Sequence, residues 1–235
     1  MARHAEPQFD SVDFHNQLAA QWEGKYSKSR FARRLLMLKR AVSVSEVSGK
    51  KWLDAGCGTG MLSRLLAKLG ARVYGIDAAP EMLQRAILLS AQQRESKNLS
   101  FLVADIERVP FPSPFFDGVL CSSVLEYVAS PGDCLKEFAR VLRPGGVLVI
   151  SVPSSRSVLR FALRCTFMLT GITGHPWPSW LAYSRHQFTR KQMLSLLAES
   201  GFDDARVVSL GSGGPSYLGD IAQLDSLFMI VARKS

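Results

Sequence analysis

The sequence of 235 residues lacks several features that define specialised classes of protein. It has no uninterrupted apolar run long enough to cross a bilayer, and its first ten residues lack the apolar core of a signal peptide. Its four cysteines show neither the paired spacing of a zinc site nor the density of a disulfide-stabilised scaffold. We therefore expect a single globular domain without a metal site, in a reducing cytoplasm.

Acidic residues are absent from two long segments, 25–45 and 138–198, although lysine and arginine are frequent in both. The net charge of the chain is +9, and its acids gather in the central part. This asymmetry predicts an anionic partner for the basic segments, such as a membrane, an acidic substrate or nucleic acid. A solvated basic surface is the alternative that composition leaves open.

Short apolar runs alternate with helical stretches from residue 50 onward. Strands are expected at 50–55, 71–77, 99–105, 116–123, 147–153, 205–210 and 227–234. The alternation predicts an α/β fold with a doubly wound, mostly parallel seven-stranded sheet, whose carboxyl edge binds a ligand. No helix separates the last two strands, so we expect them to form an antiparallel pair at one edge. Residues 14–44 are expected to be helical.

A glycine-rich turn, LDAGCGTGM, follows the first expected strand. Its third glycine comes one residue too early for a dinucleotide fingerprint. Asp54 precedes the first glycine, and a carboxylate so close to the turn is a poor neighbour for a pyrophosphate. Asp54 instead suits a cation. Asp77 and Asp105 end the next two strands, where they can accept from ribose hydroxyls and from an exocyclic amine. The three acids predict an adenosyl ligand with an ammonium group and no phosphate, although Asp77 and Asp105 are also placed to cap helices.

The segments LDAGCGTG, VYGIDAAPEML and VADIERVPF through LVISVP resemble the class I S-adenosylmethionine-dependent methyltransferases. The similarity is strongest to the small-molecule subgroup that includes quinone-biosynthesis enzymes. It implies S-adenosyl-L-methionine as cofactor and S-adenosyl-L-homocysteine as product. It also implies the cofactor-binding residues, which are Asp54, Gly56 and Gly58 for the methionine part, Asp77 for the ribose, Ala78 and Met82 beside the ribose or adenine, Asp105 and Ile106 for the adenine, and Ser122 through its carbonyl for the ammonium group.

The chain is expected to divide into four parts around this cofactor. These are a helical cover (1–49), the cofactor-binding core (50–153), a lid over the substrate site (154–187), and a C-terminal helix with antiparallel strands (188–235).

Methyl transfer is an in-line displacement that needs orientation and the exclusion of water, so a base is optional. His186 is the candidate base because imidazole titrates near neutral pH, unless it only packs at a helix entry. Tyr26 is a second catalytic candidate, or a packing aromatic. Glu126 is expected to lie in a turn. Members of the family that the sequence resembles often carry His at the position of Tyr127, so a role attached to that His does not transfer to this chain.

The expected lid is both basic and apolar. Arg156, Arg160 and Arg164 recur every four residues, which places them on one helical face among apolar neighbours. Trp177 and Trp180 follow, and tryptophan favours the membrane–water boundary. We therefore expect residues 156–183 to contact an anionic membrane peripherally or to receive a lipophilic substrate. The alternative is a lid helix that packs on the body or on another subunit, with its arginines in solvent.

These features predict a methyltransferase that acts on an oxygen or carbon of a small, lipophilic or anionic acceptor. Methylation of RNA or protein through the basic surface is an alternative, as is a non-catalytic cofactor-binding protein of the same fold. A nucleic acid is not the expected partner, because the chain has no appended RNA-binding module and has CSSV where amino-methylating enzymes carry an NPPY-like motif. An oxidoreductase with a nucleotide cofactor is disfavoured by Asp54 and by the early third glycine.

Overall fold

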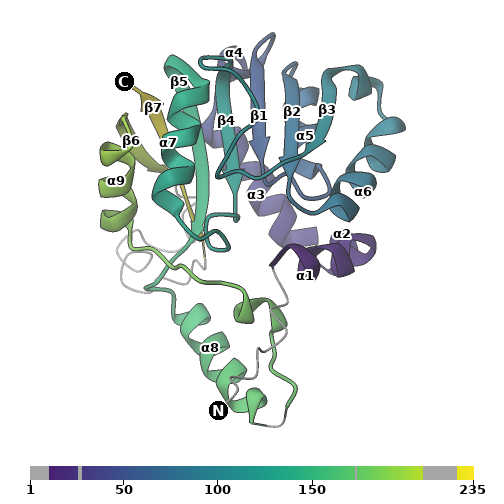
Figure 1. Cartoon of the computed structure of the whole chain (residues 1–235), viewed down its shortest axis with the longest axis vertical. Coiled ribbons are helices and arrows are strands. Elements are labelled where there is room, and N and C mark those ends of the chain that lie inside the picture. Colours follow the sequence, from purple (N-terminus) through teal and green to yellow (C-terminus); the bar gives the residue numbers. More distant parts are fainter. Residues whose placement is uncertain (1–10, 26–27, 173, 209–226) are drawn as a thin grey trace, which may run out of the picture.

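The computed structural model describes residues 11–25, 28–172, 174–208 and 227–235. Within these ranges, seven strands form one mixed sheet in the order β3-β2-β1-β4-β5-β7-β6 (Figure 1). The strands are β1 (Lys51–Ala55), β2 (Arg72–Asp77), β3 (Leu99–Val103), β4 (Phe116–Ser122), β5 (Leu142–Pro153), β6 (Phe202–Val208) and β7 (Leu227–Lys234).

The strand directions confirm the predicted doubly wound, mostly parallel sheet. The pairs from β3 through β5 are parallel. Helices connect β1 to β2, β2 to β3 and β4 to β5, whereas residues 104–115 cross from β3 to β4 without a helix. β6 and β7 form the predicted antiparallel pair, and β7 lies between β5 and β6, pairing antiparallel with both. The outer edge is therefore β6 and not the last strand.

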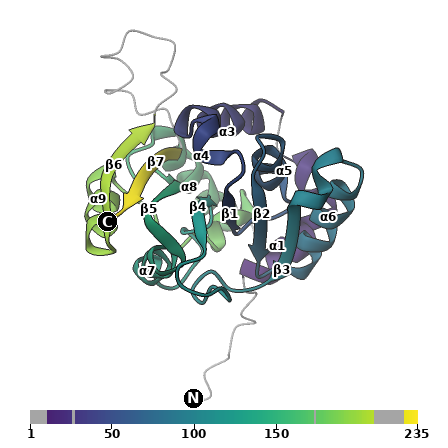
Figure 2. The same cartoon turned by 90° about the horizontal axis from the view of Figure 1, so that it is seen from above.

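Helices cover both faces of the sheet (Figure 2). They are α1 (Ser11–Leu18), η1 (Ala19–Gln21), α2 (Trp22–Lys25), α3 (Lys28–Ala41), α4 (Val44–Val47), α5 (Met61–Lys68), α6 (Pro80–Ala91), η2 (Arg94–Asn98), α7 (Pro131–Val141), α8 (Val158–Gly171), η3 (Ser179–Ala182) and α9 (Arg190–Glu199). On one face, α7 and α9 bury Phe138 and Met193 against the sheet. On the other, α3, α4 and α5 bury Leu38, Val47 and Leu66.

Two regions differ in detail from the sequence-based expectation. The N-terminal region expected as helix over residues 14–44 consists of the separate pieces α1, η1, α2 and α3, and α3 ends where Ser43 caps α4 in a capping box with Glu46. β5 begins five residues before the strand expected at 147–153, because Leu142 already pairs with Phe116 of β4, so Pro144, Gly145 and Gly146 lie inside β5. The ladder is irregular between Leu142 and Val147, and this irregularity accommodates the turn residues.

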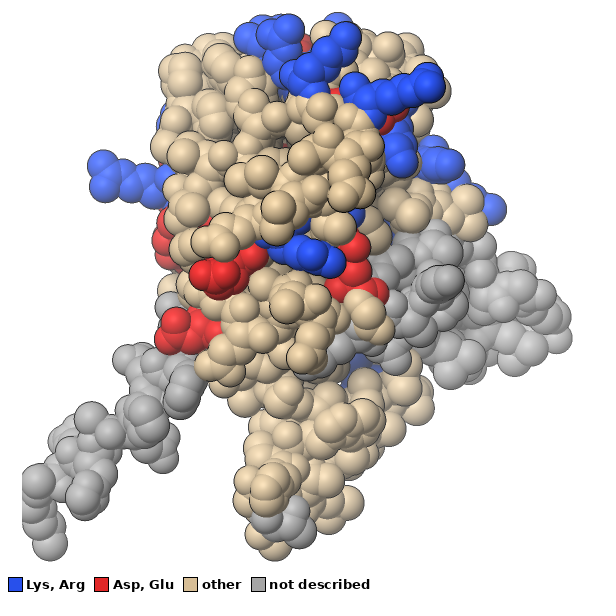
Figure 3. Space-filling view, turned by 90° about the vertical axis from the view of Figure 1, so that its right-hand side faces the viewer, with Lys and Arg blue, Asp and Glu red and all other residues tan. Residues whose placement is uncertain are grey.

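α8 and η3 project from the end of the sheet toward which β1 and β4 run (Figure 1). Of the residues in α8, all of which are described, only Arg160 is buried. The projecting part shows few charged side chains in Figure 3, whereas lysine and arginine gather at the opposite end of the molecule. None of the described helices is both long and apolar enough to cross a membrane.

Candidate active site

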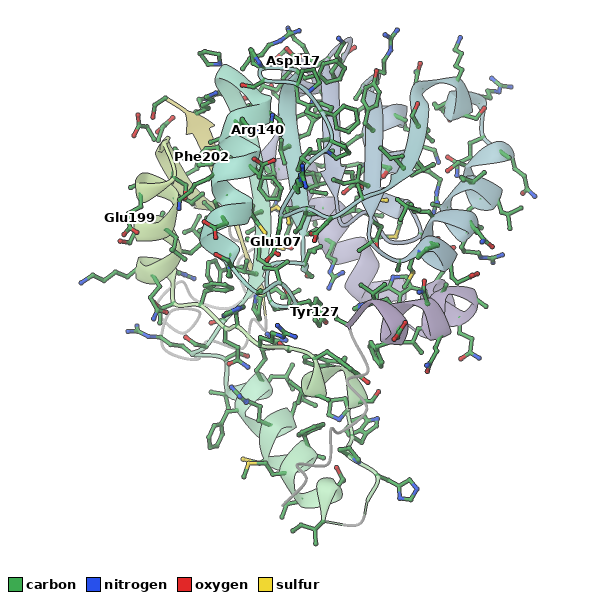
Figure 4. The ribbon with its side chains drawn as sticks, in the orientation of Figure 1. Glu107, Asp117, Tyr127, Arg140, Glu199 and Phe202 are labelled. Carbon is green, nitrogen blue, oxygen red and sulfur yellow. The ribbon has the colours of Figure 1, made fainter. Side chains whose placement is uncertain are left out.

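A cavity of about 640 Å³ lies at the carboxyl ends of the central strands. Every residue assigned to the cofactor from the sequence lines it: Asp54, Gly56, Gly58, Asp77, Ala78, Met82, Asp105, Ile106 and Ser122. Tyr127 and Glu107, which also line it, lie at this end of the sheet in Figure 4, whereas Asp117 lies at the other end. The topology explains the grouping, because parallel strands deliver their carboxyl ends to one edge.

The glycine turn is held against the neighbouring strand. The backbone amides of Gly56 and Cys57 both donate to the carbonyl of Ile76, at 2.8 and 2.9 Å. Gly56 has φ +72°, and a Cβ there would lie 2.3 Å from a methyl carbon of Val124. Only glycine tolerates both the positive φ and the lack of space for a Cβ at this position. The turn is thus packed closely against the loop that follows β4.

Asp54, the penultimate residue of β1, is a buried acid beside this turn. The hydroxyl of Ser63 on α5 donates to its Oδ2 at 2.5 Å. Burial, with a smaller contribution from the nearby charge of Asp77, raises the pKa of Asp54 to about 7, although the hydrogen bond from Ser63 acts in the opposite direction. A ligand cation beside Asp54 would stabilise its ionised form.

Asp77 joins the glycine turn to the start of α6. Its Oδ2 accepts from the amide of Gly58 at 2.8 Å, and its Oδ1 accepts from the amide of Ala79 at 2.9 Å. Burial raises its pKa. A carboxylate has about four acceptor sites, so these two bonds leave acceptors for ligand hydroxyls. Asp77 can therefore bind the backbone at the start of α6 and a ligand at the same time. Helix capping and ligand binding, which were alternatives for Asp77 from the sequence, do not exclude each other.

Asp105 and Ser122 complete the row of strand ends. Asp105 is exposed, and its Oδ1 accepts from the amide of Glu107 at 2.9 Å, which forms a turn that leaves Oδ2 available. Ser122 ends β4, and its hydroxyl is paired with that of Ser151 at 2.8 Å. The next residue, Ser123, has φ +59°, a strained conformation of the kind that concentrates at functional sites.

The N-terminal helices close one side of the cavity. Glu23 of α2 pairs with Arg64 of α5 at 2.7 Å, and Arg64 also donates to the carbonyl of Thr59 in the glycine turn at 2.6 Å. His15 of α1 lines the cavity, with its ring 5.1 Å from that of Tyr127 and 5.2 Å from that of Trp22. The positive charge that His15 can carry lowers the pKa of Asp77, although burial is the larger effect. Among the described residues that line the cavity, His15 is the histidine.

Of the two predicted catalytic residues, the structure describes only His186. His186 is not among the described residues that line the cavity, and its Nε2 donates to the carbonyl of Val128 at 3.1 Å. Since a carbonyl can only accept, this bond places the ring proton on Nε2. Tyr26 lies outside the described residues. Arg185, next to His186, does line the cavity.

Two charged residues that the sequence analysis did not assign to the site lie in the same cavity. Glu126 follows β4, and Arg160 is in the first turn of α8. Both are buried, at 2% and 5% exposure, and Glu126 Oε2 and Arg160 Nη1 have no hydrogen-bond partner among the described residues. The signal for Glu126 was a lone acid among apolar residues in SSVLEYV. Arg160 could not be distinguished from Arg156 and Arg164 in the sequence, because the three recur every four residues. In the structure, Arg156 and Arg164 are exposed.

Residues 53–150 match a family model described as a methyltransferase domain. A ubiquinone biosynthesis O-methyltransferase of Xanthomonas campestris pv. campestris is 39% identical over 116 residues, which cover 49% of this chain and 47% of that protein. A malonyl-[acyl-carrier protein] O-methyltransferase of Serratia marcescens is 39% identical over 110 residues, covering 47% of this chain and 41% of that protein. The chain thus spans about half the length of the curated relatives it matches.

The whole fold is shared with solved methyltransferases. The magnesium protoporphyrin IX methyltransferase of Synechocystis PCC 6803, solved with bound S-adenosylhomocysteine, superposes with a TM-score of 0.67. The two chains are 19% identical, and the match covers 97% of each. The sheet order is the one expected for this fold, and residues 53–150, which include the acids at the strand ends, carry the match to the methyltransferase domain family.

The residues present fit S-adenosylmethionine. Asp54 is a buried acid whose raised pKa marks it as lacking a countercharge, and the cofactor carries an ammonium group. Asp77 retains acceptor capacity for ribose hydroxyls, and Asp105 retains an oxygen for an exocyclic amine. The buried side chains of Met82 and Ile106 provide apolar surface beside them. The same set would not suit a pyrophosphate, because its acids would repel one.

Proposed function

We propose that the protein transfers a methyl group from S-adenosylmethionine to an oxygen or carbon of a small acceptor that is lipophilic or anionic. One observation carries the proposal: the cavity continues past the cofactor residues into a region lined by Leu163, Trp180, Glu126 and Arg160. This region offers both apolar surface and charge to an acceptor. The two relatives named above are O-methyltransferases by name, which supports oxygen as the acceptor atom.

The chain's own residues would act mainly by positioning. The cofactor, when bound, supplies an electrophilic methyl group on a sulfonium. Asp54, Asp77 and Asp105 would fix its orientation along the edge of the sheet, while the loop after β4 and the first turn of α8 hold the acceptor in line. Trp22 on α2 and Trp180 on η3 would exclude water from the cavity.

Titration calorimetry followed by turnover assays tests this function. S-adenosylmethionine and S-adenosylhomocysteine are expected to bind and NADH is not. With small hydroxylated acceptors, S-adenosylhomocysteine should form at a rate that changes little with salt. RNA methylation, in contrast, should weaken steeply as salt rises, because it depends on phosphate contacts. Absence of cofactor binding would refute the proposal, and cofactor binding without any turnover would favour a non-catalytic role.

We also propose that residues 156–183 contact an anionic membrane peripherally, which would place a cytoplasmic enzyme beside a lipophilic acceptor. Large apolar side chains of this segment are exposed, among them Phe161 (70%), Met168 (72%) and Ile172 (83%). Exposed Arg156 and Arg164 provide charge complementary to acidic headgroups. Burial of the helix against the body is disfavoured, because Arg160 is its only buried residue.

Flotation with phosphatidylglycerol vesicles tests the membrane contact. The protein is expected to float with these vesicles and not with phosphatidylcholine vesicles. Replacing Arg156 and Arg164 by Glu, or Phe161 and Met168 by Ser, should abolish flotation while S-adenosylhomocysteine still binds. Equal recovery of wild type and both variants would count against the contact, and a dimer disrupted by the Ser variants would assign the face to a second copy.

A further inference from the structure

Glu126 and Arg160 form a buried pair of charged groups that the cofactor contacts do not use. The acids that fit the cofactor lie at the ends of β3, β2 and β1, whereas Glu126 follows β4 and Arg160 follows β5. Along the edge of the sheet, the pair therefore lies on the β4–β5 side of the cavity, beyond Asp54. This is the side left for the acceptor.

Each member of the pair has an orphaned polar atom. Glu126 Oε2 and Arg160 Nη1 are shielded from solvent and lack a hydrogen-bond partner within the described parts of the chain. Leaving such groups unsatisfied costs free energy, more so when they are charged. The two side chains interact electrostatically but are not joined in a salt bridge. An acceptor and a donor are thus both left free at one cavity wall.

Both side chains are held in place by their surroundings. The guanidinium of Arg160 lies over the ring of Trp180, 4.9 Å from its centroid, and the Ser157 hydroxyl accepts from its amide. The carbonyl of Glu126 accepts from the amides of Arg185 (2.7 Å) and His186 (3.2 Å), which ties the segment after the lid to the loop after β4. Glu107 anchors the same loop by accepting from the amides of Ala129 and Ser130 at 3.0 Å.

We propose, resting on the methyl transfer proposed above, that the acceptor is a hydroxylated carboxylic acid, whose carboxylate binds Arg160 and whose attacking hydroxyl gives its proton to Glu126. The O–H bond of the acceptor breaks and its proton passes to Glu126. The oxygen forms a bond to the methyl carbon, and the carbon–sulfur bond breaks with its electron pair on sulfur. A methyl ether, a neutral thioether and a protonated Glu126 result. The apolar residues Leu159, Leu163 and Trp180 would contact the hydrocarbon body.

The electrostatics of Glu126 suit a base that works near neutral pH. Burial raises its pKa to about 7, and the positive charges of Arg160 on α8 and Arg34 on α3 act in the opposite direction. The thiol of Cys121 on β4 also lies near, with its pKa raised well above the usual value, so it carries no charge at neutral pH. Glu126 should be ionised above pH 7, and a rate that depends on it should rise with pH through that value.

The anion role is tested with the purified full chain, S-adenosylmethionine and matched probes: isomeric hydroxybenzoates and medium-chain hydroxyalkanoates, each beside its primary amide. At least one acid should be methylated with a kcat/KM about 10- to 100-fold above that of its amide, as expected for a charged hydrogen bond. Arg160→Gln should erase this preference, Arg160→Lys should restore part of it, and Arg164→Gln, an exposed change one helical turn away, should leave it intact. Affinity for S-adenosylhomocysteine reports whether each variant is folded. If Arg160→Gln does not fold, the comparison of Arg160→Lys with the wild type tests the proposal instead.

The base role is tested on the best acid found. Glu126→Gln should lower kcat about 10²- to 10⁴-fold with little change in acceptor KM and should remove the rise of kcat through pH 7. Glu199→Gln, on the exposed side of α9, serves as the control (Figure 4). If no acid exceeds its amide, or Glu126→Gln keeps the wild-type kcat and pH profile, the inference is wrong while the methyltransferase proposal stands. Failure to bind S-adenosylmethionine would overturn that proposal instead.

Discussion

Cofactor affinity should depend on pH through Asp54. Its pKa of about 7 means that the empty site holds an ionised Asp54 in about 3% of molecules at pH 5.5 and in about half at pH 7. The ammonium of the cofactor favours the ionised form, so binding lowers the pKa of Asp54 and releases a proton. Affinity should therefore rise about 15-fold from pH 5.5 to 7, or about 1.6 kcal/mol. Near pH 8 the rise should stop, because the cofactor's own amino group loses its proton there.

Titration calorimetry with S-adenosylhomocysteine measures this directly. Repeating the titration at pH 7 in two buffers of different ionisation enthalpy should give about half a proton released per cofactor bound. Asp54→Asn keeps an oxygen for the Ser63 hydroxyl but cannot ionise, so its affinity should vary much less with pH. A wild-type affinity that is flat between pH 5.5 and 7, or an Asn variant with the wild-type slope, would refute the assignment of Asp54 to the ammonium group.

Three further outcomes follow from the geometry. Asp77→Ala should weaken cofactor binding by about 1–3 kcal/mol in calorimetry, since it removes ligand contacts and orphans two backbone amides; unchanged binding would exclude Asp77 from the site. Gly56→Ala should lower the thermal midpoint markedly, whereas Gly49→Ala, with the same φ of +72° but open space around it, should lower it less; equal losses would mean that backbone strain alone acts. Glu23→Ala should cost about 1–3 kcal/mol in chemical unfolding by leaving Arg64 without its carboxylate, and no loss would mean that the helical cover is not held by this pair.

Much of the fold could be predicted because its signals are local. Alternating apolar runs and helical stretches specify a parallel sheet, and the absence of a helix before the last strand specifies an antiparallel pair. The position of β7 between β5 and β6 could not be predicted, since it depends on pairing between segments far apart in the chain. The same holds for the start of β5, where Pro144, Gly145 and Gly146 lie in an irregular stretch between Leu142 and Val147, both of which pair with β4.

The residues of the candidate site likewise include some that could be predicted from the sequence and some that could not. Asp54, Asp77 and Asp105 could be placed together because strand ends meet at one edge. Glu126 and Arg160 could not, since their roles depend on burial and on the rotation of α8 about its axis. A four-residue spacing makes Arg156, Arg160 and Arg164 equivalent in the sequence, yet only Arg160 faces the cavity. The sequence favoured His186 for its chemistry alone, which says nothing of where a side chain points.

The placement of β7 has a consequence for how the protein is made on the ribosome. Both strands that flank β7 precede it in the chain, so β6 has no partner in the sheet until β7 has been synthesised. The cofactor half, from β1 to β5, has its strand pairings complete earlier and can fold first. A ribosome that pauses before residue 227 would therefore expose unpaired edges on β5 and β6, both of which are open to aggregation. Slow synthesis just before the last strand should thus be more harmful than slow synthesis after it.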